Sequence, residues 1–372
     1  MTDFNVTDSD DTDAEAFYIQ ISQGYVNGED RLELLGSHPS IVTSWNVSEG
    51  KLILNGASGS KVSYIDFIAA VKDVVFESSS DIPSAKSFSI TVGDANYLPS
   101  TEHYYEFVSS IGITWTAAKA AAESRTYYGL QGYLATVAAP DEAQLVGEQA
   151  SGAGWIGGSD AQTEGIWKWV TGPEAGTVFW NGNANGSSPN FAYWNTREPN
   201  QSGDEDYAHI TAPNVGIPGS WNDLSNTGAT IGDYQPKGYI VEYGGMPGDP
   251  VLNISASTRI FTTAIENTVS ASVCDGGMLT LEANASNSGD VLWFSTPTGG
   301  VPIHTGNIYT VNVTAPTIYY VLASINGCIS GQRVAVTAEV TTTPTIISVS
   351  GDAICGSGTG TLQATPSAGT VH

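Results

Sequence analysis

The sequence predicts a multidomain chain in which an all-β module, an α+β module and a second all-β module follow one another. Residues 1–98 and 251–343 consist of short runs of alternating apolar and polar residues separated by Gly, Asn and Ser, which is typical of strands and turns. Between them, residues 99–246 hold two segments rich in helix-forming residues, followed by short Trp- and Gly-rich strands. The length of 372 residues suits several domains of roughly 100 to 200 residues.

Acidic residues dominate the charge of the chain. With 38 Asp and Glu against 12 Lys and Arg, the formal net charge is −26, which excludes a nucleic-acid backbone as partner and disfavours attachment to anionic lipid. No window approaches the roughly 18 consecutive apolar residues of a membrane-spanning helix, so we expect no direct membrane insertion. The first residues lack the features of a signal peptide, and we expect the chain to be an excerpt from a longer protein.

The first module, residues 1–98, contains the strand-like runs AFYIQIS, KLILNG and SFSITVGD. The segment YIDFIAAVKDVVF fits either a short helix or a buried connection. FNVTDSDDTDAEAFYIQISQGYVNG and FSITVGDANYLP resemble the two ends of a cadherin-like repeat, which implies an all-β cadherin-like sandwich. The resemblance further implies that Asp8, Asp10 and Asp11, together with Asp94, bind an inter-domain calcium ion. An acidic turn without a ligand is the alternative.

The second module, residues 99–246, begins with the two helix-like segments. TWTAAKAAAESRTYYG is predicted to form a helix that Thr114 caps and that Gly129 ends. APDEAQLVGEQA is predicted to form a second helix, with Pro140 in its first turn and acidic residues after it, where the helix dipole favours negative charge.

One loop of this module is unusually rich in oxygen. TREPNQSGDEDYAHI, residues 196–210, offers Glu198, Asn200 and Glu205, and SWNDLSN adds Asn222 and Asp223 shortly afterwards. Calcium takes six to eight oxygen ligands from carboxylates, carboxamides and water. Neither segment holds the Cys or the several His residues that zinc or copper prefer. The two segments therefore predict a calcium site built by two loops.

EPN, ED and WND, downstream of WIGGSDAQTEGIWKWVTG and the helical pair, resemble a C-type lectin domain over residues 101–245. The resemblance implies the C-type lectin fold and one calcium ion that also meets the sugar. Its ligands would be Glu198, Asn200, Glu205, Asn222 and Asp223. The order EPN, rather than QPD, implies glycans with equatorial 3- and 4-hydroxyls, such as mannose, glucose, N-acetylglucosamine and fucose. Pro199 would follow a cis peptide bond and turn Glu198 and Asn200 toward the same ion.

The family's auxiliary calcium site has a less complete match. Asp160, Glu164 and Asp206 stand at three of its positions, but Gln201 occupies the position where a further acid is expected. Whether a second ion binds is therefore left open. Residues 101–246 also lack cysteine, unlike many animal members, so we expect the tryptophans of this module to stabilise it as core residues.

From residue 247 the chain is predicted to return to β-structure. Residues 247–268 are expected to form a linker and a first strand region, and residues 269–343 an immunoglobulin-like sandwich. The sandwich is indicated by the order Cys274, Trp293, Cys328, which also implies a disulfide between the two cysteines. Residues 344–372 resemble the start of the same unit, with Cys355 in the place of Cys274. We therefore expect further modules beyond both ends, and an oxidising compartment.

The arrangement of cadherin-like, lectin and immunoglobulin-like modules resembles long surface adhesins of Bacteroidota. It implies a secreted, extracellular or cell-surface bacterial protein that uses calcium for cell adhesion through carbohydrate binding. A pseudo-lectin with a protein ligand or none, and a calcium-stiffened spacer of a surface filament, are the alternatives. Glu205 and Asp206 are adjacent carboxylates, but alternation along a strand points them to opposite faces, so we expect no enzyme. His209 is expected to belong to the scaffold.

Overall fold

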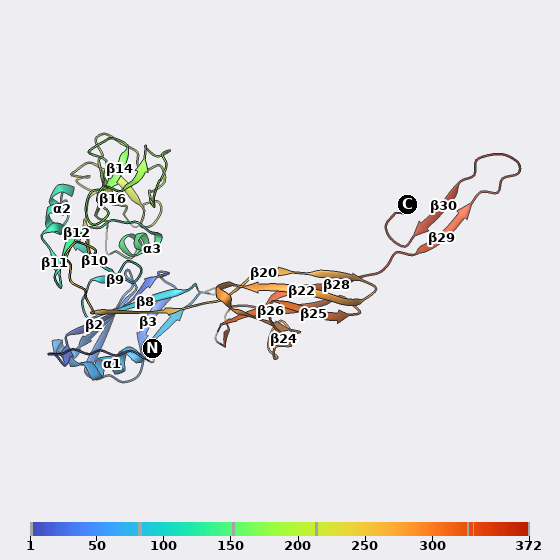
Figure 1. Cartoon of the computed structure of the whole chain (residues 1–372), viewed down its shortest axis with the longest axis horizontal. Coiled ribbons are helices and arrows are strands. Elements are labelled where there is room, and N and C mark those ends of the chain that lie inside the picture. The colour runs from blue at the N-terminus through green and yellow to red at the C-terminus, as the bar shows by residue number, and fades with distance from the viewer. Residues whose placement is uncertain are drawn as a thin grey trace. The chain divides into compact units, whose positions relative to one another are not determined.

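The computed structural model describes residues 3–80, 84–150, 153–212, 215–325, 327–329 and 331–370, the side chain of Cys328 excepted. The chain folds into two compact units, one made of the described residues up to Ile260 and the other of those from Phe261 onward. Strands dominate both units, in agreement with the predicted fold class (Figure 1). No helix of the described residues is long and apolar enough to cross a membrane.

The first module is built on a five-stranded antiparallel sheet with the strand order β19-β8-β2-β5-β4. Its strands are β2 (Ala16–Gln23), β4 (Ile41–Asn46), β5 (Lys51–Gly56), β8 (Lys86–Thr91) and β19 (Ser255–Ile260). Two further antiparallel pairs are β3 (Asp30–Leu34) with β7 (Val74–Ser78), and β1 (Asp13–Ala14) with β6 (Val62–Ser63). Phe17, Ile19 and Ile21 alternate along β2 and are buried in the core, as the period-two pattern predicts. The cadherin-like resemblance stays a prediction.

The segment YIDFIAAVKDVVF, whose sequence fits either a helix or a buried connection, forms helix α1 (Tyr64–Lys72). Ser63 caps it, since the Ser63 hydroxyl accepts a hydrogen bond from the backbone N–H of Asp66 at 3.2 Å. Phe67, Ala70 and Val71 follow the i, i+3, i+4 spacing of one helix face and are fully buried. Burial of this face decides in favour of the helix.

Strand β19 belongs to the first module although it follows the second module in the sequence. It lies within residues 247–268, where a linker and a first strand region are predicted. All six of its residues pair with β8, from Ser255 opposite Thr91 to Ile260 opposite Lys86. The second module is therefore inserted between two neighbouring strands of the first.

The second module combines two short helices with a ten-stranded sheet that follows the path β11-β12-β18-β13-β14-β15, with β9, β10, β16 and β17 paired beside it. Its elements are β9 (Asn96–Leu98), β10 (His103–Ser109), α2 (Trp115–Glu123), β11 (Thr126–Tyr127), β12 (Leu130–Leu134), α3 (Pro140–Ala143), the π-helical turn η2 (Gln144–Glu148), β13 (Trp155–Ser159), β14 (Ile166–Trp169), β15 (Val178–Asn181), β16 (Tyr207–Ile210), β17 (Trp221–Leu224) and β18 (Gly238–Tyr243).

Both predicted helices exist but are shorter than expected. Thr114 caps α2 as predicted, accepting a hydrogen bond from the N–H of Ala117 at 3.2 Å. The predicted end at Gly129 is wrong, because α2 ends at Glu123 and the chain turns into β11. Tyr127 explains the early end, since its ring is buried against those of Tyr104 and Tyr243, at 5.2 and 5.4 Å between centroids. The second helix keeps only four α-helical residues before it loosens into η2.

Tryptophan rings form the centre of the second module. Trp155, Trp167, Trp169 and Trp221 are fully buried, as predicted for core residues. Trp169 stacks on Phe179 with 4.3 Å between ring centroids, and Trp221 meets Trp169 edge to face at 5.5 Å. This aromatic core takes the place of the missing disulfides in supporting the long loops.

Polar side chains join the first and second modules around η2. The buried Gln149 donates from Nε2 to the carbonyls of Ile21 (2.9 Å) and Glu49 (2.7 Å). Gln144 accepts from the N–H of Gly24 and donates to the carbonyl of Tyr25, at 2.9 Å each. Each of these bonds satisfies a backbone group of the first module, so together they tie the two modules to each other in a defined orientation.

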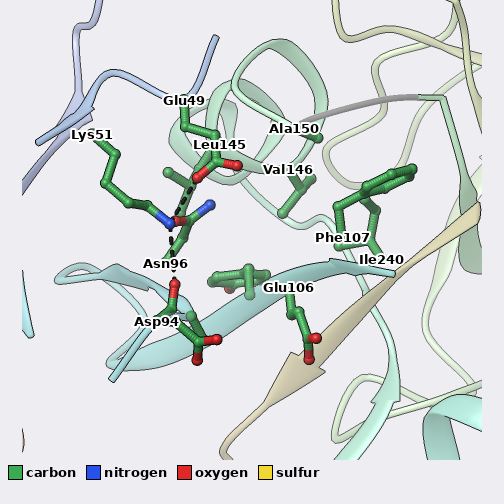
Figure 2. A pocket seen from close by; sticks show the side chains of 12 residues that line it. Glu49, Lys51, Asp94, Asn96, Glu106, Phe107, Leu145, Val146, Ala150 and Ile240 are labelled. Atoms are coloured by element: carbon green, nitrogen blue, oxygen red, sulfur yellow. Dashed lines mark hydrogen bonds and ion pairs between the residues drawn. The ribbon is translucent and has the colours of Figure 1, made fainter. Parts of the chain in front are cut away.

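Figure 2 shows the small polar cavity, about 100 Å³ in volume, that lies in this junction. Lys51 reaches across it from β5, donating to the carbonyl of Asp94 at 3.1 Å and pairing with the carboxylate of Glu49 at 2.7 Å. Because Lys51 is largely buried, its charge needs both the Asp94 carbonyl and the Glu49 carboxylate as partners. The two modules therefore dock specifically in the arrangement that keeps both contacts.

The third module is a two-sheet sandwich, and residues 346–366 form a separate hairpin. One sheet has the order β20-β22-β25 and the other β21-β28-β26-β23-β24, with β27 beside β26. The elements are β20 (Ile265–Val269), β21 (Ala271–Cys274), β22 (Gly277–Ala285), β23 (Asp290–Phe294), β24 (His304–Thr305), β25 (Ile308–Val313), β26 (Thr317–Ile325), β27 (Cys328–Ile329), β28 (Val334–Thr341), and the hairpin strands β29 (Ile346–Gly351) and β30 (Leu362–Pro366). Trp293 is fully buried in the sandwich core, as predicted.

The predicted disulfide between Cys274 and Cys328 is wrong. Among the described side chains, Cys274 and Cys355 are free and exposed. Cys274 pairs with Thr341, at the last residue of β28, whereas Cys328 pairs with Ile325 beyond the first residue of β28. The eight residues of β28 span about 23 Å, far more than the roughly 7 Å that a disulfide tolerates between Cα atoms. The Trp293 core therefore supports this sandwich without the bridge.

Glu142 of α3 and Glu242 of β18 form a buried carboxylate pair. Glu142 and Glu242 both accept hydrogen bonds from the Tyr105 hydroxyl, at 2.8 and 3.3 Å, and His103 Nδ1 lies 2.6 Å from Glu242. Burial, reinforced by the charge of Glu242, raises the pKa of Glu142 to about 7. The ordinary pKa of a glutamate is near 4.5, so the folded chain holds this proton more tightly than the unfolded chain.

This shift predicts a pH dependence of stability. The contribution of Glu142 to the free energy of unfolding is fully present below about pH 4.5 and is lost as the pH rises through about 7. Glu142→Gln should flatten this slope and raise the free energy of unfolding at pH 8 by about 1 to 3 kcal/mol. Urea unfolding followed by tryptophan fluorescence measures it, since seven of the nine tryptophans lie in the second module. The exposed Glu102→Gln is the control, and an unchanged slope in Glu142→Gln would contradict the assignment.

Candidate functional site

The structure brings the two oxygen-rich segments together through the pairing of β16 with β17. Ala208 lies opposite Asp223 and His209 opposite Asn222 in this antiparallel pair. Asn222 and Asp223 therefore occupy a strand, and Glu205 stands just before the neighbouring strand. The EPN loop, residues 198–200, folds over the same edge. Glu198, Asn200, Glu205 and Asp223 thus lie close to one another. Asn222 adjoins them in sequence, but its side chain is buried with Oδ1 3.3 Å from His209 Nδ1.

Asp223 holds the EPN loop in place. Its Oδ1 accepts a hydrogen bond from the N–H of Asn200 and its Oδ2 one from the N–H of Gln201, both at 2.9 Å. The carboxylate is only 1% exposed, so each oxygen has a partner in a site that water scarcely reaches. The Glu198–Pro199 peptide bond is cis, as predicted, and Gln201 adopts a positive φ of 52°.

The other two acidic residues of the predicted site, Glu198 and Glu205, make hydrogen bonds within and beside this loop. Asn200 Nδ2 donates to Glu198 Oε2 at 2.5 Å, and Glu205 Oε2 accepts from the N–H of Ser202 at 2.8 Å. Burial and the neighbouring Asp223 raise the pKa of Glu198 to about 8. Burial, with a further contribution from Asp223, also raises the pKa of Glu205. Half-buried carboxylates that resist ionisation are the electrostatic signature of a site that a cation would stabilise.

The donor chemistry fits calcium, although the donors are not fully assembled. Carboxylate and carboxamide oxygens make up all five predicted ligands, which suits a hard cation. Across the residues that the structure describes, no group of three or more His, Cys, Asp and Glu side chains is gathered tightly enough to hold a metal ion. The side chains of Glu198 and Asn200, which now bond to each other, would have to turn toward an ion.

The three residues of the predicted auxiliary site also lie near one another. The N–H of Asp160 donates to the carbonyl of Asp206 at 3.2 Å. Asp160 Oδ2 accepts from the N–H of Gly165 at 2.9 Å, while its buried Oδ1 has no partner among the described residues. Burial, with the charges of Glu164 and Asp206 adding to it, raises the pKa of Asp160 to about 7.

Gln201, the residue that departs from the family pattern, takes part in this second cluster. Its Nε2 donates to Glu164 Oε2 at 2.8 Å. A neutral carboxamide therefore occupies one acceptor of Glu164, where a carboxylate would add negative charge. The arrangement weakens the attraction of this cluster for a cation relative to the principal one.

His209 belongs to the scaffold, as expected. It is fully buried, packs edge to face against Trp155 at 5.0 Å between centroids, and has Nδ1 3.3 Å from Asn222 Oδ1. Burial lowers the pKa of His209 to about 4, so the ring is neutral at pH 7. Its position opposite Asn222 was not predicted. The spacing of YAHI and WND carries no signal for this position, because strand register alone sets it.

The predicted inter-domain ligands of the first module are only partly assembled. The N–H of Asp10 donates to Asp8 Oδ1 at 3.3 Å, and the Tyr64 hydroxyl donates to Asp8 Oδ2 at 3.4 Å. Asp8, Asp10 and Asp11 are all exposed, and Asp94 instead offers its carbonyl to Lys51 at the module junction. The inter-domain calcium ion therefore stays a prediction, with an acidic turn without a ligand as its alternative.

Comparisons with known proteins identify two of the modules. The family model "Ig-like domain CHU_C associated" matches residues 262–341. C-type lectin domain family 4 member M of Hylobates lar is 35% identical over 80 residues, and CD209 antigen-like protein D of Mus musculus is 38% identical over 89 residues. These matches cover 22% and 23% of this chain, and 16% and 30% of the two relatives. The chain thus contains a C-type lectin-like domain and an immunoglobulin-like domain, as predicted.

A longer match extends over more than one module. Halomucin of Haloquadratum walsbyi is 33% identical over 290 residues, which is 74% of this chain but 3% of that protein. Among solved structures, a calcium-independent type II antifreeze protein has 20% identity and a TM-score of 0.28. The mouse scavenger receptor C-type lectin carbohydrate-recognition domain has 21% identity and a TM-score of 0.26. They cover 41% and 40% of this chain and 94% of each structure.

The role of Asp223 as the anchor of the EPN loop can be tested without any ligand. Asp223→Ala in a calcium-free buffer should lower the free energy of unfolding by about 2 to 4 kcal/mol, because it leaves two backbone N–H groups without charge-assisted partners. This loss exceeds the relief of repulsion with Glu198, which is only half buried. Urea unfolding measures it, with the exposed Asp204→Ala as the matched control. Equal stability of the two variants would show that Asp223 does not organise the loop.

Proposed function

We propose that the second module binds carbohydrate in a calcium-dependent manner, as part of an extracellular adhesin. One observation carries the proposal: the Asp223 carboxylate fixes the EPN loop beside Glu205 and Asn222, so that oxygen donors with raised pKa values gather at one edge. The similarity to C-type lectin domains supports the same role. The proposed principal ligands are Glu198, Asn200, Glu205, Asn222 and Asp223.

The proposed mechanism divides the work between the ion and the side chains. Bound calcium would supply coordination positions for two neighbouring hydroxyls of a sugar. Glu198 and Glu205 accept hydrogen bonds from those hydroxyls, and the carboxamides of Asn200 and Asn222 donate to them. Each hydroxyl is thereby satisfied as donor and as acceptor. The order acid then amide in EPN favours equatorial 3- and 4-hydroxyls, the class of mannose, glucose, N-acetylglucosamine and fucose.

The proposal is limited to one calcium ion. Gln201 donates to Glu164 in the second cluster and places a neutral group where a carboxylate would add charge. Asp160, Glu164 and Asp206 therefore act in the proposal as supports of the loop.

The proposed role is non-catalytic. His209 is fully buried and its lowered pKa of about 4 keeps the ring neutral, so it cannot reach a substrate as a general acid or base. Asp223 spends both oxygens on backbone N–H groups. These two observations support a binding role over an enzymatic one.

The surroundings fit a protein displayed outside the cell. A net charge of −26 keeps such a chain soluble and repels nucleic acid and anionic lipid. The immunoglobulin-like module and the long match to Halomucin support a surface or secreted location. We propose that further modules of the same protein space the sugar-binding site from its attachment point.

Glycan binding by the whole chain tests the proposal. We expect binding to arrays of mannose-, glucose-, N-acetylglucosamine- or fucose-bearing glycans with calcium, reversible loss with EGTA, and affinity lowered by about tenfold or more in Glu198→Gln. Asp204→Asn, an exposed acid of the same loop, is the matched control. Failure to bind any glycan with calcium would favour the pseudo-lectin or spacer. Binding insensitive to EGTA would remove calcium from the mechanism, and turnover of a bound glycan would favour an enzyme.

A double substitution tests the proposed sugar class. Glu198→Gln with Asn200→Asp reverses the order of donor and acceptor in the EPN loop, and should shift preference toward galactose by about tenfold or more, or about 1.4 kcal/mol. Competition of free mannose and galactose against a bound glycan measures the ratio. Unchanged preference, with calcium binding retained, would show that the loop does not select the hydroxyl configuration.

A further inference from the structure

Strands β2, β8 and β19 of the first module are neighbours in one sheet, and their order determines how tension along the chain would act on them. From this order we propose that the first module carries tension applied along the chain and keeps the second module out of the path of that force. The inference rests on strand order and register, and it holds whether or not the second module binds a sugar.

The entry and exit of the second module are clamped together. The chain leaves β8 at Thr91 to enter the second module and returns into β19 at Ser255, and these two residues are paired. One step further out, the N–H of Val92 donates to the carbonyl of Ile254 at 3.1 Å. Force passing along the chain can therefore cross from β8 to β19 through the strand ladder, without stretching residues 93–253.

The ladder is loaded in shear. β2 and β19 flank β8, and both run antiparallel to it. β2 starts near the Thr91 end of β8, since Tyr18 pairs with Thr91, whereas β19 finishes opposite Lys86 at the other end. Tension that enters at the start of β2 and leaves at the end of β19 pulls these strands past one another. Because ladder hydrogen bonds lie across the strands, they all bear such a load together instead of opening one by one.

The end of β8 where β19 leaves is anchored in the core. Lys86 is fully buried, and its Nζ lies 2.6 Å from Asp30 Oδ2 and 2.5 Å from the carbonyl of Gly24. Breaking this buried pair would strand an unpaired charge, which is strongly unfavourable. The Lys86–Asp30 pair and the Lys86–Gly24 hydrogen bond thus hold β8 against β3 and the end of β2. Force applied to β19 is therefore passed through β8 to these other parts of the module.

The second module is also held to the first beside this clamp. Gln149 bonds to the carbonyls of Ile21 and Glu49, the former on β2, and Gln144 bonds to the backbone of Gly24 and Tyr25. Leu252 and Ile254, on the return segment, pack against the core of the second module. The inserted module is therefore docked onto the strands that bear the load and does not hang from two extended linkers.

Stretching single molecules of the whole chain from its two ends tests the proposal. Extending the roughly 160 residues between Val92 and Ile254, at about 3.5 Å each, adds about 560 Å of length. We expect this step never to occur before the first module ruptures. A 560 Å step that precedes rupture of the first module, with the remaining length released later at higher force, would overturn the proposal.

Two proline variants of β19 form a matched pair. The Val92–Ile254 bond sets the alternation of the antiparallel ladder. The N–H of Thr258 therefore points toward β8, whereas the N–H of Ser257 points away from β8, outward from the edge of the sheet. Thr258→Pro should lower the rupture force and allow the 560 Å step to come first, whereas Ser257→Pro should leave the order unchanged. Equal behaviour of both variants would contradict a ladder-borne load.

A cross-link identifies the 560 Å step even if the proline variants fold poorly. Ser89 and Ser257 are opposite each other, so Ser89→Cys with Ser257→Cys, in a chain whose own cysteines are replaced by serine, can form a disulfide. The step should vanish in the oxidised chain and return on reduction. Its persistence after oxidation would show that the step does not come from the second module.

Discussion

The carboxylate of Asp223 is the interaction on which the candidate site depends. The EPN loop has no regular secondary structure of its own, and two hydrogen bonds from its backbone to one buried side chain give it a defined path. Asp223 in turn owes its position to the pairing of β17 with β16 and to the aromatic core around Trp221. Strand β17 thus positions Asp223 and Asp223 positions the loop, so loss of the Asp223 carboxylate would release Glu198 and Asn200.

The same anchor creates an electrostatic imbalance. Glu198 and Glu205 share a half-buried region with Asp223, and burial together with this neighbour raises their pKa values. A protein region that accumulates like charge without a compensating cationic side chain is poised to gain stability from a bound cation. The second cluster shows the contrasting solution, since Gln201 uses a neutral donor to satisfy Glu164. The two clusters therefore differ in chemistry although both are rich in acids.

The sequence and the structure agree where local pattern governs and differ where distant segments meet. Helix α2 starts at Thr114 because capping is local, but it ends early because Tyr127 is drawn into a core built from β10 and β18. Trp293 is buried as the sandwich pattern predicts, whereas Cys274 and Cys328 fall at opposite ends of β28. Residue order cannot report the distance between two cysteines, because strand pairing determines it. Strand β19 likewise pairs with β8 although the whole second module separates them in the sequence. Hydrogen bonding between the strands determines this pairing, and residue composition carries no information about it.

By itself the sequence determined the order of the modules, the oxygen donors of the site and the proline of the EPN loop, because these are properties of residue type and spacing. Only the tertiary structure decided that Asp223 holds the loop by its backbone, that Gln201 bonds to Glu164, and that His209 lies opposite Asn222. Each of these contacts joins residues at least 13 positions apart. Their meeting depends on strand register and core packing, which set distances that no short stretch of sequence contains.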